Sequence, residues 1–120
     1  MRIAVTSQGT DLTSKVDPRF GRASYFLVFD TTDESFEVVE NSQNVNAAQG
    51  AGIQAAENIA GQNVDIVVAG NFGPKAFQAL GAAGIKTVQW TDGTVAEAIE
   101  LARNDKLETT DKPNVEGHWM

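Results

Sequence analysis

The stretch from Val64 to Ala69 restricts the possible folds more than any other part of the sequence. Five of its six residues are apolar, which is typical of a strand buried on both faces of a parallel sheet. A glycine-rich turn follows at residues 70–73, and Pro74 begins a predicted helix that ends at Leu80, with Gly81 just beyond it. Because parallel strands are joined by crossover helices, this β–turn–α unit predicts an α/β fold.

Hydrophobic patterns elsewhere predict four more strands and two more helices. The strands lie at 2–6, 24–30, 36–40 and 85–90, and the helices at 47–60 and 94–102. The second and third strands form a hairpin, the first lies in the middle of the sheet, and the last lies nearer an edge. With right-handed crossovers, this order predicts a three-layer α/β/α arrangement around a five-stranded mixed sheet.

We expect a single domain at residues 1–103 and a polar tail at residues 104–120. The tail ends in His118, Trp119 and Met120. These side chains could supply a soft metal ligand or an aromatic lid, but a loose terminus is the favoured interpretation.

The chain contains no cysteine and a single histidine. Thiolate nucleophiles, cysteine-ligated clusters, sulfur-based zinc sites and Ser-His-Asp catalysis therefore lack their residues. We predict no catalytic residues and no metal ligated by the protein, and we expect a binding protein rather than an enzyme.

The formal net charge is −7, from 16 acidic and nine basic residues. This balance disfavours nucleic acid, whose partners usually carry a basic face. No apolar run approaches the roughly 20 residues that cross a bilayer, and the N-terminus lacks a signal-peptide core. We therefore expect a cytoplasmic protein with neither nucleic acid nor membrane as a partner.

Three of the nine basic residues, Lys15, Arg19 and Arg22, lie within eight positions of one another. Pro18 fixes its own backbone angle, and Gly21 permits angles that a side chain would forbid. The turn is either a cradle for an anion, since guanidinium groups match flat or multi-oxygen anions, or a charged surface turn paired with local carboxylates.

Two glycine-rich stretches add candidate contacts. Gly50 and Gly52 fall in the first turns of the predicted helix at 47–60, where glycine is costly. Either another backbone or a ligand approaches closely there, or the helix packs tightly on the sheet. The turn at 70–73 precedes a helix N-terminus, which favours an anion, although its spacing is not that of a Walker loop.

The ordered set of motifs resembles the dinitrogenase iron–molybdenum cofactor biosynthesis family. The matching features are Asp17–Arg22 before an aromatic strand, the amide run leading into Gly50 and Gly52, residues 67–73 entering a helix, and Leu80 with Gly84 and Ile85 before the next strand. The resemblance extends over residues 1–102 and implies a ribonuclease-H-like three-layer fold, which agrees with the predicted order. It also implies binding of a preformed metal–sulfur cluster rather than turnover.

Within this family the chain resembles the orange-protein branch better than the nitrogenase accessory branch. The nitrogenase branch often has a histidine, a metal ligand, where this sequence has Arg19. The orange-protein branch implies a non-covalently held molybdenum–copper sulfide cluster, with a related iron–molybdenum–sulfur cluster as the other cargo. The resemblance further implies protein partners for cluster delivery or regulation, and we expect a monomer.

A cluster that brings its own sulfide needs positive charge and N–H donors from the protein. Basic side chains, amides, glycine N–H groups and shielding phenylalanines are the candidates. The predicted binding residues are Lys15, Arg19, Phe20, Gly21, Arg22, Asn44, Asn46, Gly50, Gly52, Asn71, Phe72 and Gly73. Two alternatives stay open: a regulatory protein-interaction module without a cluster, and a metal-dependent nuclease, whose converging carboxylates the scattered acidic residues do not suggest.

Overall fold

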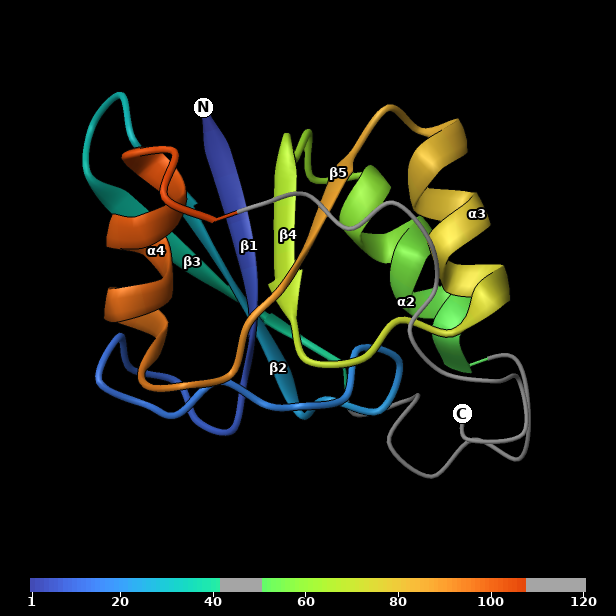
Figure 1. The fold of residues 1–120 in the computed structure, drawn as a ribbon, viewed down its shortest axis with the longest axis horizontal. Coiled ribbons are helices and arrows are strands. Elements are labelled where there is room, and N and C mark those ends of the chain that lie inside the picture. Colours follow the sequence, from blue (N-terminus) through green and yellow to red (C-terminus); the bar gives the residue numbers. More distant parts are fainter. Residues whose placement is uncertain (42–50, 108–120) are drawn as a thin grey trace.

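The protein is built around one five-stranded sheet with the strand order β3-β2-β1-β4-β5 (Figure 1). The computed structural model describes residues 1–41 and 51–107. The strands are β1 (Arg2–Ser7), β2 (Tyr25–Asp30), β3 (Ser35–Glu40), β4 (Ile66–Ala69) and β5 (Lys86–Gln89). β1 lies in the middle, antiparallel to β2 and parallel to β4, while β2 and β3 form an antiparallel hairpin and β5 continues the parallel half. The predicted mixed sheet, its central first strand and its hairpin are confirmed.

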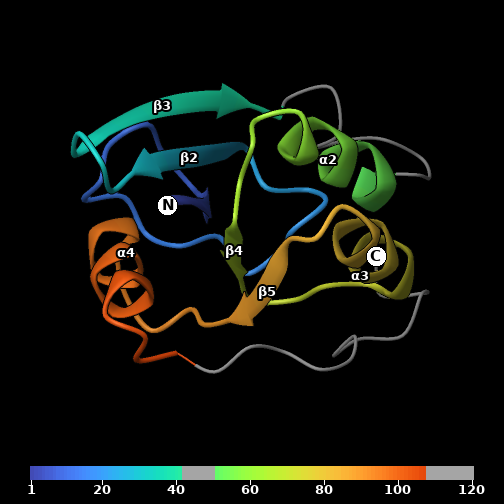
Figure 2. The same ribbon diagram turned by 90° about the horizontal axis from the view of Figure 1, so that it is seen from above.

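Helices cover both faces of the sheet, as the sequence predicts. They are α2 (Ala51–Ala60), α3 (Pro74–Ala82) and α4 (Val95–Arg103). Figure 2 shows α2 and α3 side by side on one face and α4 alone on the other. Residues 47–50 of the predicted helix at 47–60 lie outside the described residues. Among the residues described, no helix is long and apolar enough to cross a membrane.

The end of α3 differs from the prediction. Gly81 lies inside the helix, and Gly84, with a φ of 77°, ends it instead. The N–H of Ile85 then donates to the carbonyl oxygen of Leu80, the long bond that closes a helix on a left-handed residue. A helix continues past a glycine that keeps helical angles, so the terminating glycine is the one that adopts positive φ.

Because side chains alternate between the two faces of each strand, the sheet separates two apolar cores. Along β1, Ala4 faces the core under α2 and α3, whereas Ile3 and Val5 face the core under α4. The first core holds three phenylalanine rings as well as the aliphatic side chains of α2 and α3. Because both sides of β1 are buried, the backbone at its carboxyl end is a fixed support for the segment that follows β1.

The carboxyl ends of the three parallel strands β1, β4 and β5 meet at one edge of the sheet (Figure 1). β3 also ends at this edge, because β2 reverses the chain between β1 and β3. Open α/β sheets bind ligands at the carboxyl ends of their strands, and the basic turn of the sequence lies here.

Candidate anion-binding site

Residues 15–22, called here the arginine loop, cross the carboxyl ends of the parallel strands (Figure 1). Isolated backbone bridges join Ser7 to Val16, Lys15 to Thr94, and Arg19 to Asn71. The loop is therefore attached to the end of β1, to the segment after β4 and to the start of α4. This attachment brings Lys15, Arg19 and Asn71, all predicted site residues, to the same edge of the molecule.

A pair of buried hydrogen bonds fastens the loop to the central strand. The N–H of Asp17 donates to the carbonyl oxygen of Thr6 at 3.0 Å, and the Thr6 hydroxyl donates back to the carbonyl oxygen of Asp17 at 2.7 Å. Thr6 is fully buried. Buried polar groups that satisfy each other in this way are costly to separate, so the loop has a defined position over β1.

The side chain of Asp17 shapes the turn that carries Arg19. Its carboxylate accepts a hydrogen bond from the backbone N–H of Arg19 at 2.9 Å and contacts Nε of the same residue at 3.4 Å. The carboxylate is 4% exposed, whereas the side chain of Arg19 is 55% exposed. The local ion pair considered from sequence is therefore present, but it involves Nε and leaves the two terminal guanidinium nitrogens out of the contact.

Glycine allows the loop to pack backbone against backbone at two points. A Cβ atom on Gly21 would lie 2.8 Å from the nitrogen of Gly52, and one on Gly70 would lie 2.6 Å from the carbonyl oxygen of Pro18. Of the alternatives left open for Gly52, the structure shows another backbone close to it, and that backbone is the arginine loop. Gly70 lets the same loop cross the end of β4.

Asn41 holds the far side of the loop, and sequence reasoning did not single it out. Its fully buried side-chain amide donates to the carbonyl oxygens of Gly21, at 3.0 Å, and Ala23, at 2.8 Å. Its position at the start of the amide-rich run after β3 was the available signal. Burial of one amide against two loop carbonyls depends on the folded arrangement and could not be read locally.

The two predicted shielding phenylalanines belong to the core. Phe20 is 1% exposed and Phe72 is fully buried, with ring centroids 5.4 Å apart. Phe20 also packs against Phe26 at 5.4 Å. These rings pack beneath the arginine loop and the β4–α3 turn and hold both in place. Because the rings lie on the inner side of these loops, they exclude water from that side.

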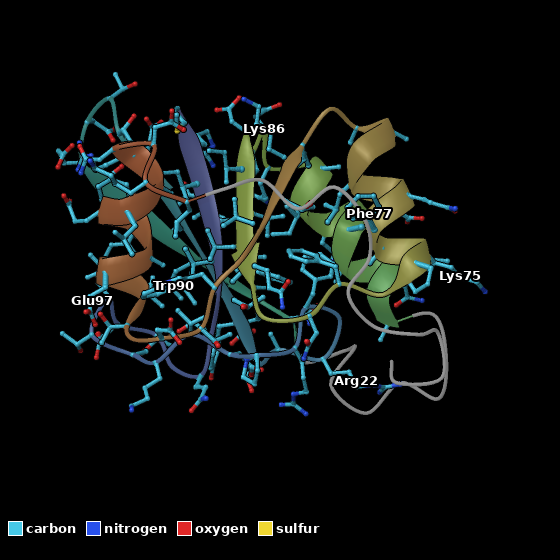
Figure 3. All side chains as sticks on the ribbon, in the orientation of Figure 1. Arg22, Lys75, Phe77, Lys86, Trp90 and Glu97 are labelled. Carbon is cyan, nitrogen blue, oxygen red and sulfur yellow. The ribbon has the colours of Figure 1, made fainter. Side chains whose placement is uncertain are left out.

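An open pocket of about 320 Å³ adjoins the arginine loop. It is lined by Pro18, Gly70, Asn71, Gln89, Trp90, Thr91 and Asp92. Only Asn71 among these was a predicted binding residue. Figure 3 places Trp90 beside α4 at the end of β5, where its partly buried ring also packs on the second core. Most of the lining residues that the sequence did not predict lie at the carboxyl end of β5, the parallel neighbour of β4. The predicted sheet order alone could have indicated this position.

The charges at this edge are unevenly spread. Lys15 and Arg19 are exposed and Arg22 is half-buried, and Figure 3 shows Arg22 at the same edge of the sheet. Asp92, at the pocket wall, and the buried carboxylate of Asp17 are opposing charges there. The donors at this edge are guanidinium, ammonium and amide groups. No cluster of three or more histidine or carboxylate side chains suited to a metal ion occurs within residues 1–41 and 51–107. This donor set fits an anion that brings its own ligands.

The turn into α3 adds N–H groups to the same edge. Gly73 is the N-cap residue, makes no side-chain capping bond, and is followed by Pro74 at the first helical turn. The helix dipole and the N–H groups of its first turn favour negative charge nearby. Of the remaining predicted residues, Asn44, Asn46, Gly50 and the terminal His118–Met120 lie outside the described residues.

Comparison with known proteins gives a consistent result. Residues 1–105 match the model of a family described as dinitrogenase iron–molybdenum cofactor. An uncharacterised protein of Methanocaldococcus jannaschii is 29% identical over 98 residues, which span 79% of this chain and 82% of that protein.

Several solved structures are similar to this chain over nearly their full length. The apo form of the orange protein from Desulfovibrio gigas is 42% identical, with a TM-score of 0.92 over 95% of this chain and 96% of the other. A candidate NifB protein from Thermotoga is 38% identical, with a TM-score of 0.80 over 95% and 98% of the two chains. The α/β fold and the resemblance predicted from sequence are thereby confirmed.

Proposed function

Because the chain belongs to the dinitrogenase iron–molybdenum cofactor family, we propose that it binds and carries an anionic metal–sulfur cluster without any covalent link. The observation that supports this most is the exposed side chain of Arg19, on a loop that is bridged to Ser7, Asn71 and Thr94 and whose Pro18 lines an open pocket. The family association also favours a carrier over a catalyst.

Charge and donor chemistry support the same reading. Without cysteine the chain offers no thiolate ligand, so the proposed cargo is a cluster whose outer ligands are its own sulfides. Charge-assisted N–H donors from Arg19, Arg22 and Lys15 would then bind its outer sulfur atoms, aided by the amide of Asn71. Arginine suits this role because its planar fork presents several donors at fixed angles.

The cargo that we propose is a molybdenum–copper sulfide cluster. The likeness to the orange protein, at 42% identity, makes this cargo the first to test. An iron–molybdenum–sulfur cluster, which the family description suggests, is the second. Both are compact anions at neutral pH, so the same basic loop would serve either one.

The test is reconstitution of the metal-free protein with tetrathiomolybdate and copper. We expect a visible charge-transfer spectrum that stays with the protein through desalting. Replacing Arg19→Ala and Arg22→Ala together should weaken retention by at least about tenfold, because two charge-assisted contacts are removed.

The matched control removes two positive charges elsewhere, with Lys86→Ala and Lys106→Ala. Both lysines are exposed, and Lys86 begins β5 at the opposite edge of the sheet (Figure 3). We expect this variant to retain the cluster as the wild type does. Equal retention by the arginine variant, or equal loss in the control, would contradict the proposed site.

A further inference from the structure

The two outer strands of the sheet differ in how their free edges are protected. β5 has four residues and begins with the exposed Lys86. β3 has six residues, all exposed except the half-buried Val39. Figure 2 shows β3 as the outermost strand on its side, and its only strand partner among the described residues is β2. Short strands and lysine are common protections for an edge, and β3 has neither.

The exposed side of β3 carries an apolar pair. Phe36 and Val38 are 38% and 40% exposed, and they lie opposite Phe29 and Leu27 of β2 in the sheet register. Phe29 and Leu27 belong to the core under α4. The apolar face of the sheet thus continues past the helix onto the edge strand, where a further strand would extend it.

The charges along this edge are all of one sign. Residues 33–40 contain Asp33, Glu34, Glu37 and Glu40 and no basic residue. Glu34 is already paired with Arg103 of α4. Within the residues that the structure describes, no salt bridge involves Glu37 or Glu40. Pairing of β3 with a second copy of the chain would oppose like charges, which destabilises a strand pair.

The acidic residues do not block the apolar pair. Neighbouring strand residues point to opposite faces, so Glu37 points away from the face that carries Phe36 and Val38. Glu40 shares that face but is the last residue of the strand, beyond the apolar pair. No proline interrupts β3. Alternate backbone N–H and C=O groups point outward from an edge strand, where they can pair with an incoming chain.

We propose that β3 accepts an extended segment of a partner protein as a sixth strand, with apolar side chains on one face and lysine or arginine between them. The apolar side chains would cover Phe36 and Val38, and the basic ones would meet Glu37 on the opposite face. β3 leads into Asn41, whose amide holds the arginine loop. A strand docked here would therefore end beside the candidate site without covering it.

The experiment uses the metal-free full chain, labelled with ¹⁵N, and two blocked synthetic hexapeptides. One alternates valine with lysine and the other alternates valine with glutamate. We expect the lysine peptide to shift the amide resonances of residues 35–40, with little effect on 86–89, and the glutamate peptide to shift neither set. Cluster binding has no part in this measurement, so its failure leaves the proposed function untouched.

Two variants with the same change in charge complete the test. Val38→Lys puts a positive charge into the apolar face of β3, whereas Gln78→Lys puts one on the exposed side of α3. The first should weaken binding of the lysine peptide by at least about tenfold, through lost apolar contact and like charge, and the second should not. Absence of binding to the wild type, shifts confined to other regions, or equal effects of the two variants would overturn the proposal. A wild-type dimer in sedimentation that Val38→Lys disperses would overturn it in favour of self-association.

Discussion

Gly21 is the residue at which the arginine loop tolerates the least change. The atom that alanine would add lies 2.8 Å from the nitrogen and 2.9 Å from the Cα of Gly52. Backbone atoms at the start of α2 cannot swing aside as a side chain can, so the loop and the helix would have to separate. The same separation would strain the two hydrogen bonds that Asn41 makes to this part of the loop.

We expect Gly21→Ala to lower the free energy of unfolding by about 1–3 kcal/mol, the usual cost of overpacking. Gly81→Ala is the matched control, because it adds the same atom inside α3 where nothing lies within 4 Å. That variant should raise stability by about 0.5–1 kcal/mol through better helix propensity. Urea unfolding of both proteins measures the difference, and similar effects of the two changes would refute the role given to Gly21.

The start of α4 is the element most closely tied to the site. Thr94 and Glu97 form a capping box, in which each side chain accepts the backbone N–H of the other at 3.2 Å and 3.0 Å. The next two N–H groups of the helix, from Val95 and Ala96, donate to carbonyl oxygens of the segment before the arginine loop. This segment, through Ser14, leads directly into Lys15. Stability of the helix end and position of the loop are therefore linked.

Thr94→Ala should lower the free energy of unfolding by about 1 kcal/mol, as the loss of an N-cap usually does. The hydrogen bonds from Thr94 hold the pKa of Glu97 below its ordinary value. A carboxyl group with a lowered folded-state pKa stabilises the protein above its unfolded-state pKa, and that stabilisation is lost as the pH falls through the folded-state pKa.

The acid limb of the stability curve should consequently be shallower in Glu97→Gln than in the wild type, while the two curves run parallel near neutral pH. Thermal unfolding between about pH 3 and 7 measures this. Glu57→Gln, at an exposed position of α2, is the control for the loss of a carboxylate. Identical acid limbs in the wild type and Glu97→Gln would argue against the linkage.

Element types and order could be predicted because their signals are local. The apolar run before Gly70, the hairpin pattern and the capping box at Thr94 each lie within a few residues. The sequence did not predict the roles of Asn41 and Trp90, because each depends on a partner distant in the chain. It also placed the end of α3 at Gly81 rather than at Gly84, because the end depends on which glycine adopts a positive backbone angle. The basic turn was recognisable by charge contrast, whereas its attachment through Thr6 required the fold.

At the scale of the whole molecule, net charge and local charge oppose each other. The chain carries −7 overall, while the arginine loop is locally basic. The molecule measures 36 × 27 × 26 Å. At about 0.01 M salt the Debye length is about 30 Å, comparable with these dimensions, so an approaching anion meets the field of the whole protein. At about 0.1 M it is about 10 Å, and the nearby loop dominates.

We therefore expect the association rate of tetrathiomolybdate to rise as salt increases from about 0.01 to 0.1 M, and to fall towards 1 M as the loop itself is screened. Stopped-flow absorption measures the rates. The arginine double variant should show the rise with little of the later fall, because Lys15 is then the only cation left in the loop and the net repulsion dominates. A steady decrease in the wild type from the lowest salt upward would contradict this balance of fields.

The arginine loop owes its shape to residues other than the ones that would touch a ligand. Phe20 is set in the core, Gly21 against α2, and the backbone of Asp17 on β1. Position 19, half open to solvent between these anchors, can change its side chain while the framework around it persists. Evolution can thus alter the chemistry of the loop by exchanging single residues on an inherited frame, and a protein engineer can use the same freedom at Arg19 to install a different ligand.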